Sequence, residues 1–314
     1  MQTSPEPADP DAASPDAADL DAADPDPGDP GDSGAEDPRS EELAANLAAV
    51  HARIDRAMEA AGRQDRPTLI VVTKFFPAAD VLRLHRLGVR DVGENRDQEA
   101  AAKAAEVTEL LRAGTAAPAA PGSAGAPAGP ADDPASEPAD DPAADPASGP
   151  AANEEVLHWH FIGQLQSNKA RSVTGYADHL HSVDRSSLLK ALIKVAPSAE
   201  EPPLTCLIQV DLRDPVPADG RGGADPALIL ELADRIAAAP GLALGGLMAV
   251  APLDEPAAPA FRRLRELSAQ LRERHPGADM ISAGMSGDLE EAVAHGATHL
   301  RVGRDVLGAR PLQR

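Results

Sequence analysis

The sequence predicts a single (β/α)8 barrel, and three observations favour this fold. Eight short apolar runs rich in β-branched residues alternate with patterns typical of amphipathic helices. Several runs end in glycine or polar residues. This is typical of barrel strands, because the binding or catalytic site of such a barrel lies at the carboxyl ends of its strands. The first run is followed by Thr73-Lys74-Phe75-Phe76-Pro77. A doubly wound sheet that binds a dinucleotide has a glycine-rich turn at this point, so that alternative is disfavoured.

The expected elements begin with a helix. Its apolar side chains recur every three or four residues, at Leu43, Leu47, Val50, Ile54 and Met58. Ser40 is the expected N-cap and Gly62 the expected end. The eight expected strands span residues 69–73, 89–93, 157–163, 179–184, 204–212, 246–251, 279–283 and 299–303. Further helices are expected over residues 77–87, 225–239, 260–274 and 289–296.

Two stretches hold most of the negative charge. Residues 1–40 carry 12 acids and one Arg, and residues 113–152 carry six acids and no base, in a chain of net charge −22. Their Ala, Pro, Asp, Gly and Ser bury too little apolar area to offset chain entropy. We expect a disordered acidic tail over 1–40, and a barrel over 41–314 that a disordered insertion interrupts at 113–152. We expect both acidic stretches to serve only to keep the protein in solution. The alternative is that they bind a basic partner.

Composition excludes several classes of protein. Cys206 is the single cysteine, so a disulfide framework is excluded. The apolar runs are far shorter than the roughly 20 residues that span a bilayer. A secretory leader, in which a basic segment precedes an apolar one, is not expected either. The net charge of −22 would repel phosphate backbones. We therefore expect a cytoplasmic protein that binds neither membranes nor nucleic acid.

Lys74 is a candidate nucleophile. It follows the first apolar run directly and precedes Phe75 and Phe76. Apolar surroundings disfavour the ammonium form, and only the neutral amine attacks a carbonyl to form a Schiff base. The alternative is a lysine that is simply solvated, as most lysines at strand ends are.

A candidate phosphate site follows the seventh and eighth strands. Small residues fill the segment from Ser282 to Gly287, so backbone N–H groups can turn toward an anion near a helix start. The eighth strand ends at Gly303, and phosphate sites after strands seven and eight recur in such barrels. Glycines that only form turns are the alternative.

Further polar groups lie near other strand ends. Asn95 could contact a ring-shaped ligand or cap the next helix. His158 and His160 alternate on one strand, and His179 and His181 on the next, so these rings could meet as metal ligands would. No acidic ligand of matching spacing accompanies them, and hydrogen-bonded barrel histidines are commoner. We therefore expect no metal site.

Eight segments together resemble one known family. They are Ile70-Val71-Val72-Thr73-Lys74, Gly93-Glu94-Asn95, His160-Phe161-Ile162-Gly163, Leu165-Gln166-Ser167-Asn168-Lys169, His181-Ser182-Val183-Asp184-Arg185, Gly246-Leu247-Met248-Ala249, Gly284-Met285-Ser286 and Arg301-Val302-Gly303. In this order, over about residues 41–310, they resemble the pyridoxal phosphate homeostasis protein family. The resemblance implies a barrel of the alanine racemase N-terminal type that binds pyridoxal 5'-phosphate (PLP). The two acidic stretches have no counterpart in that family.

The resemblance also implies a role for each candidate site residue. Lys74 would form the Schiff base with PLP, and Arg301 would lie against the pyridine nitrogen. The ring pocket would be lined by Asn95, Ser182 and Met248. The phosphate would be held or surrounded by Ser282, Gly284, Met285, Ser286 and Gly303, with Arg304 beside them.

Three positions depart from the common pattern of the family. Arg96 stands where a tyrosine often follows Gly-Glu-Asn, and Ala283 replaces a larger residue. Arg304 stands where a small hydroxyl residue often helps to hold the phosphate. Arg304 could therefore strengthen the phosphate site or point to solvent.

The expected function is storage and delivery of PLP through the Lys74 Schiff base, without a strong reaction of its own. PLP-dependent apoenzymes are the candidate recipients. Arginine has no acceptor, so Arg301 would keep the pyridine nitrogen unprotonated and weaken carbanion chemistry. Related racemases share this arginine, however, so it does not separate the two functions.

A PLP-dependent amino-acid racemase is the alternative function. Such racemases add a C-terminal β domain and use a tyrosine opposite the lysine as a second acid/base. Here only eleven residues follow Gly303, and the sole tyrosine, Tyr176, lies between expected strands three and four. Loss of that group costs about 10²- to 10⁴-fold in rate. A metal-dependent hydrolase is a third possibility, but it leaves Lys74 without a role.

Overall fold

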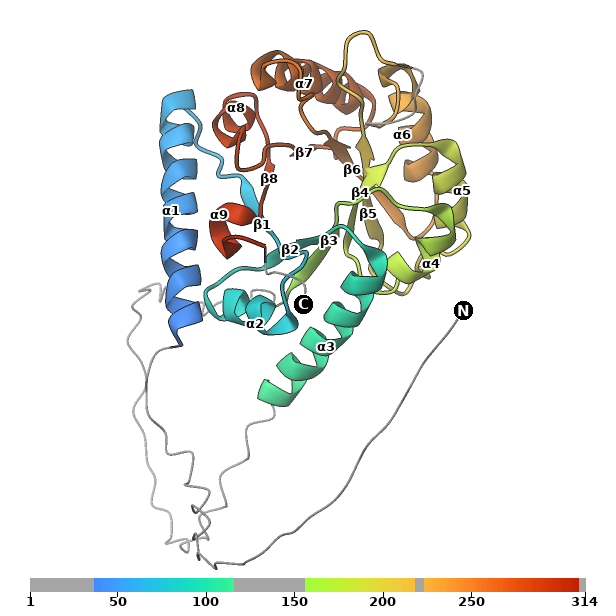
Figure 1. Ribbon diagram of the computed structural model, residues 1–314. Coiled ribbons are helices and arrows are strands. Elements are labelled where there is room, and N and C mark those ends of the chain that lie inside the picture. The colour runs from blue at the N-terminus through green and yellow to red at the C-terminus, as the bar shows by residue number, and fades with distance from the viewer. Residues whose placement is uncertain (1–36, 116–155, 218–222, 311–314) are drawn as a thin grey trace, which may run out of the picture. The chain divides into compact units, whose positions relative to one another are not determined.

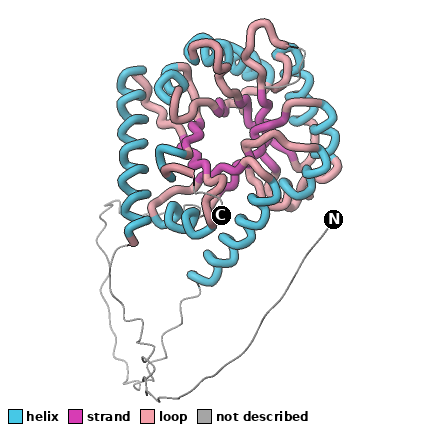
Figure 2. The backbone as a smooth tube through the Cα atoms, viewed as in Figure 1, coloured by secondary structure: helices cyan, strands magenta, loops and turns pink. Residues whose placement is uncertain are grey.

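The computed structural model describes residues 37–115, 156–217 and 223–310, and shows eight parallel strands closed into a barrel (Figure 1). The strands pair in chain order, and β8 pairs with β1 to close the ring. Figure 2 shows the strands as an inner ring with helices around it. The predicted (β/α)8 barrel is confirmed. Residues 1–36 of the expected tail, and the expected insertion from residue 116 onward, lie outside the described residues. Residues 37–40 were also expected in the tail, but they form the N-cap and first turn of a helix, so that part of the prediction was wrong.

The strands are short and mostly buried, because helices cover one face and the barrel interior the other. They are β1 (Thr68–Val72), β2 (Asp91–Glu94), β3 (His158–Phe161), β4 (His179–Val183), β5 (Leu204–Gln209), β6 (Leu242–Met248), β7 (Met280–Ser282) and β8 (His299–Val302). The expected bounds are most wrong for β6, which begins at Leu242 and not at Gly246. Gly246 lies inside the strand and does not begin it. A Cβ there would stand 2.1 Å from the Met280 carbonyl oxygen, so close packing against β7 requires glycine at this position.

The first helix, α1 (Pro38–Ala61), buries the apolar face that the sequence predicts. Its N-cap is Asp37, so the prediction of Ser40 was wrong. The Asp37 carboxylate accepts from the Arg39 backbone N–H at 3.1 Å, and Pro38 occupies the first helical position, where proline is well tolerated. Gly62 ends the helix in the left-handed conformation at φ 63°, as predicted.

The other helices cover the outside of the barrel (Figure 1). They are α2 (Ala78–Arg86), α3 (Asp97–Thr115), α4 (Ala170–Val173), α5 (Ser186–Ile193), α6 (Ile229–Ala237), α7 (Ala257–Arg274), α8 (Leu289–Ala294) and α9 (Arg304–Leu307). Two 3-10 turns precede α4 and α6, namely η1 (Ser167–Lys169) and η2 (Pro226–Leu228). Helix α3 runs through residue 115, so its last three residues fall within the expected insertion. Among the described residues, no helix has the length and apolar content that crossing a membrane requires.

Candidate functional site

A pocket of about 540 Å³ gathers the chain segments that follow β1, β7 and β8. This volume is within the usual range of small-molecule sites, about 300–1,000 Å³. Six of the predicted site residues line it, namely Lys74, Met285, Ser286, Arg301, Gly303 and Arg304. The predicted strand-end chemistry of β1, β7 and β8 therefore converges on one cavity.

Lys74 lies in the turn between β1 and α2 and is half-buried. Its Nζ lies 5.7 Å from the centroid of the Phe75 ring and makes no hydrogen bond or ion pair with a described residue. Phe75 has φ 72°, a left-handed conformation that costs energy for a residue with a side chain. The strained turn places both residues on the wall of the pocket.

A buried ion pair anchors this turn from beneath. Lys103 of α3 donates to the Thr73 carbonyl oxygen at 2.9 Å and to Glu94 Oε1 at 2.6 Å. The Thr73 hydroxyl donates to the same carboxylate oxygen at 2.7 Å. The residue before Lys74 is thus fixed to the end of β2. The sequence analysis did not identify Lys103, because its partners come from other elements.

The loop between β7 and α8 has the free donors that a phosphate site needs. Gly284 has φ 90°, and a Cβ there would stand 2.5 Å from the Ala292 Cβ, so only glycine fits. The Met285 backbone N–H is already used, because it donates to Asp288 Oδ1 at 2.6 Å. The backbone N–H groups of Ser286 and Gly287 make no hydrogen bond with a described residue. These two groups can therefore bind an anion in the pocket.

Arg53 of α1 supports this loop from the outer side. Its guanidinium donates to the Ser286 carbonyl oxygen at 3.0 Å and forms ion pairs with Glu290 at 2.8 Å and Asp305 at 2.7 Å. One side chain thereby joins α1 to the loop, α8 and α9. The amphipathic pattern of α1 gave no signal for this contact.

An Arg53→Met variant is expected to weaken binding of PLP, the ligand that the family resemblance implies, about three- to tenfold, because the loop loses its outer support and two carboxylates lose their cation. Titration with PLP followed by absorbance measures the effect. Arg56→Met is the matched control, since Arg56 is exposed on the same helix. Equal affinities for the two variants would show that Arg53 does not support the loop.

Arg301 lies on β8 with 4% of its surface exposed and contributes to the pocket lining. Its guanidinium donates to Ser282 Oγ at 2.7 Å and to the Ala249 carbonyl oxygen at 2.9 Å. Burial lowers the pKa of Arg301 to about 10, so the side chain still carries its charge at neutral pH. Arg301 is thus a fixed, donor-only cation at the pocket.

The barrel interior holds the histidines that the sequence predicts to meet. His160 Nδ1 lies 2.9 Å from His181 Nε2, and the His160 ring stacks on His179 at 4.3 Å between centroids. His160 Nε2 lies 2.9 Å from Asp91 Oδ1. The sequence analysis missed this acid because β2 and β3 come together only through the register of the sheet. Among the described residues, no group of three or more acidic, cysteine or histidine side chains could hold a metal ion.

Burial governs the charge of these rings. It lowers the pKa of His181 well below its ordinary value, with His160 and Arg301 adding to the effect. Burial also lowers the pKa of His179 to about 3 and that of His299 to about 4. His179, His181 and His299 are therefore neutral imidazoles at physiological pH.

The other predicted ring contacts, Asn95, Ser182 and Met248, do not line this pocket. Met248 and Ser182 are buried in their strands, and Asn95 lines a neighbouring pocket of about 450 Å³. Neither Asn95 Oδ1 nor Ser182 Oγ has a hydrogen-bond partner among the described residues. Asn95 Oδ1 therefore does not cap α3, which was the alternative role. A Cβ at Gly163 would stand 2.2 Å from the Asn95 carbonyl oxygen, so this glycine lets β3 approach the end of β2.

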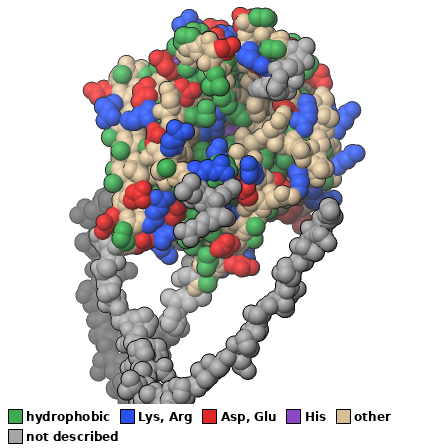
Figure 3. Space-filling view, in the orientation of Figure 1, with side chains coloured by type: hydrophobic (Ala, Val, Ile, Leu, Met, Phe, Trp, Pro, Cys, Tyr) green, Lys and Arg blue, Asp and Glu red, His purple; other side chains and the backbone are tan. Residues whose placement is uncertain are grey.

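Cations surround the mouth of the pocket. Arg310 lies 3.7 Å and Arg96 5.4 Å from the Phe75 ring centroid, and Arg96 also pairs with Glu99 at 3.0 Å. Arg304 is exposed at the first position of α9 and lines the pocket. Lys and Arg side chains also gather near the middle of the face in Figure 3. Such a mouth attracts anionic ligands.

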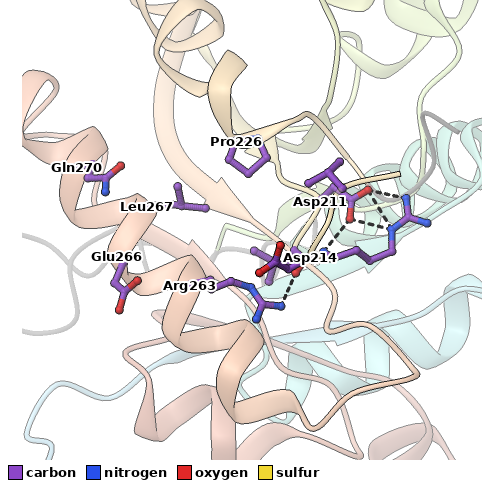
Figure 4. Close-up of a pocket in the computed structure, with 10 residues that line it drawn as sticks. Asp211, Asp214, Pro226, Arg263, Glu266, Leu267 and Gln270 are labelled. Atoms are coloured by element: carbon purple, nitrogen blue, oxygen red, sulfur yellow. Dashed lines mark hydrogen bonds and ion pairs between the residues drawn. The ribbon is translucent and has the colours of Figure 1, made fainter. Parts of the chain in front are cut away.

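Another pocket, of about 270 Å³, lies between α7 and the segment after β5 (Figure 4). Asp211 pairs with Arg213 on one side, and Arg263 and Glu266 extend from α7 on the other. None of the predicted site residues lines this pocket. The pocket after β1, β7 and β8 is therefore the candidate site.

Comparison with known proteins identifies the family of this chain. A family model described as the alanine racemase N-terminal domain matches residues 45–311. A pyridoxal phosphate homeostasis protein of Mycobacterium bovis is 39% identical over 292 residues, which cover 90% of this chain and 98% of that protein. One of Escherichia coli K12 is 33% identical over 273 residues, which cover 86% of this chain and 97% of that protein.

A solved structure has the same fold. PipY of Synechococcus elongatus, with PLP bound, superposes with a TM-score of 0.58 at 29% identity, covering 85% of this chain and all of that chain. The expected resemblance is confirmed by these matches along most of the barrel. The chain belongs to the pyridoxal phosphate homeostasis protein family, within the larger family of alanine racemase N-terminal domains.

Proposed function

We propose that this chain binds PLP through Lys74 and stores and delivers it in intracellular PLP homeostasis. The observation that carries the proposal is a lysine amine in the same pocket as the N–H groups of Ser286 and Gly287, none of which has a partner among residues 37–115, 156–217 and 223–310. PLP supplies an aldehyde, which condenses reversibly with a primary amine, and a phosphate, which accepts hydrogen bonds. The names of the relatives and the PLP-bound PipY structure support the proposal.

The pocket residues fit PLP in charge and in hydrogen bonding. The loop donors and Arg304 would hold the phosphate, with Gly303 leaving room at the start of α9. Asn95 Oδ1 and Ser182 Oγ lie outside the lining of this pocket, but both are buried without a partner among the described residues, so each would gain one if the ring extended to it. Met248 would pack nearby as an apolar contact.

Equilibrium dialysis against PLP tests the proposal. We expect saturable binding of one PLP per chain, with inorganic phosphate competing because it uses the same loop donors. Binding that does not saturate, or that phosphate does not reduce, would contradict the site.

We further propose that the loaded protein has no strong turnover. Arg301 offers only donors, so it would leave the ring nitrogen unprotonated and weaken the withdrawal of electrons that carbanion chemistry needs. The same would hold in a related racemase, so the proposal depends on Tyr176. Tyr176 does not line the pocket, and its buried hydroxyl has no hydrogen-bond partner among the described residues. This tyrosine is therefore not positioned as the second acid/base of a racemase.

An amino-acid racemase assay of the PLP-loaded protein is expected to show rates far below about 1 s⁻¹, the low end of ordinary enzyme turnover. Chiral chromatography of L-alanine after incubation measures the rate. Turnover in the ordinary enzyme range would establish the racemase alternative. The catalytic acid/base would then have to come from a group other than Tyr176.

PLP-dependent apoenzymes are the proposed recipients, and the cytoplasm is the proposed site of action. The pocket mouth carries the cations Arg96, Arg304 and Arg310. These charges suit docking against an acidic surface of the recipient. Recovery of activity by an apoenzyme mixed with the loaded protein would measure delivery.

A further inference from the structure

We propose that Arg301 is positioned by a hydrogen-bond chain of fixed direction that crosses the barrel interior to Asp91. From Arg301 Nη1 the chain passes through Ser282 Oγ at 2.7 Å, His181 at 2.9 Å and His160 at 2.9 Å, and it ends at Asp91 Oδ1 at 2.9 Å. Five strands, β2, β3, β4, β7 and β8, each contribute one residue to it. The ends of the chain lie on opposite sides of the two imidazole rings.

The Arg301 end fixes one direction. A guanidinium has no acceptor, so Ser282 Oγ must accept from Arg301. Ser282 is fully buried, and within the described part of the chain its only other partner is His181 Nδ1. The single hydroxyl hydrogen would lack an acceptor unless it is donated to this nitrogen. His181 therefore accepts at Nδ1 and, being neutral, carries its hydrogen on Nε2.

The Asp91 end fixes the same direction independently. A carboxylate only accepts, so His160 must donate from Nε2. The pKa of Asp91 lies below its ordinary value although burial tends to raise it. The hydrogen bond from His160 is the largest lowering cause, and the carboxylate stays ionised. A neutral His160 carries only this one hydrogen, so in that state it accepts at Nδ1 from the His181 Nε2–H. Both ends thus require the Nε2–H tautomer of each ring.

The surrounding groups do not supply a competing donor or acceptor. His179 stacks on His160, while the His158 and His299 rings lie further out in the same cluster. His179 and His299 are neutral, and none of the three makes a hydrogen bond with either ring of the chain. The chain is therefore a closed set of donors and acceptors.

This chain gives Ser282 and His181 a positioning role. The Ser282 hydroxyl hydrogen points to His181, so the side chain is not available to donate to a phosphate, the role that the family resemblance implies for it. Instead it holds one of the two anchored nitrogens of Arg301. The consequence for cofactor binding rests on the proposed function, but the tautomers themselves do not.

Long-range ¹H–¹⁵N NMR of the full chain without PLP tests the direction first. We expect His160 and His181 both to be neutral with the hydrogen on Nε2 at pH 7. A hydrogen on Nδ1 of either ring, or a doubly protonated His160, would overturn the proposal. This result is independent of whether the protein binds PLP.

Variants at the two ends give a sharper test. Ser282→Ala and Asp91→Asn are each expected to leave the Nε2–H tautomers in place, because the other end still fixes the direction. Only the double variant should show a mixture of tautomers. A mixture in either single variant, or none in the double variant, would overturn the account, and general loosening of the fold would not produce this pattern.

PLP affinity reports on the positioning of Arg301. Ser282→Ala is expected to weaken PLP binding about tenfold, because a charge-assisted hydrogen bond to Arg301 is lost. Ser268→Ala is the matched control, since Ser268 is equally buried but lies on α7 without a hydrogen-bond partner for its hydroxyl. Equal affinity of the Ser282 variant and wild type would overturn the positioning role. If wild type itself binds no PLP, the proposed function fails while the NMR result still decides the chain.

Discussion

Lys74→Ala is expected to abolish borohydride-stable attachment of PLP and to weaken PLP binding by about 100-fold, or roughly 3 kcal/mol. Among the described residues, Lys74 is the only lysine that lines the pocket, and the variant removes its amine. The loop N–H groups of Ser286 and Gly287 remain, so weak binding through the phosphate should persist. Absorbance titration and mass measurement after reduction separate the two effects.

Lys190→Ala provides the control for this experiment, because Lys190 is an exposed lysine on α5. This variant should bind and retain PLP as wild type does. Unchanged attachment of PLP in the Lys74 variant would show that another amine holds the cofactor. Because Thr73 is fixed by Glu94 and Lys103, loss of the Lys74 side chain should leave the melting temperature nearly unchanged.

Gly284→Ala is expected to destabilise the fold by about 2–4 kcal/mol. Two costs combine: a residue with a Cβ at φ 90° is strained, and its Cβ would stand 2.5 Å from the Ala292 Cβ and 3.0 Å from a Leu300 methyl group. Helix α8 must move to accommodate the methyl, and the loop that carries the phosphate donors moves with it. Denaturant unfolding measures the stability, and PLP titration measures the loop.

Gly287→Ala is the matched control for stability. Gly287 belongs to the same loop, but its φ is not positive and a Cβ there would meet nothing within 4 Å. Its free energy of unfolding should stay within about 1 kcal/mol of wild type. Similar losses in the two variants would mean that the loop tolerates no side chain of any kind, and that packing against Ala292 is not the cause.

The sequence predicts those parts of the site that depend on one strand and its following turn. Lys74, Ser286 and Gly303 were found because a strand end, a run of small residues and a terminal glycine are local patterns. The barrel was predicted for the same reason, since each strand and most helices have their own periodicity. The ends of elements were predicted less accurately, as the wrong N-cap at Ser40 and the wrong start of β6 show. Helix capping and the packing of glycines depend on contacts with other parts of the chain.

The contacts that support the site could not be predicted, because they join elements far apart in the chain. Arg53 reaches the β7–α8 loop across more than 200 positions, and Asp91 meets His160 only when β2 and β3 pair in register. Lys103 occupies a helix whose charged residues look like an ordinary solvated face. Closure of the barrel brings these partners together, and a single sequence without its fold contains no pattern that reports it.

Reduction of the PLP-loaded protein with borohydride, followed by peptide mass mapping, tests the central claim most directly. The account predicts a visible absorbance band that reduction abolishes, and a pyridoxyl phosphate mass on the peptide that contains Lys74. Reduction without a modified peptide, or modification confined to other lysines, would contradict the assignment of Lys74 as the group that holds PLP.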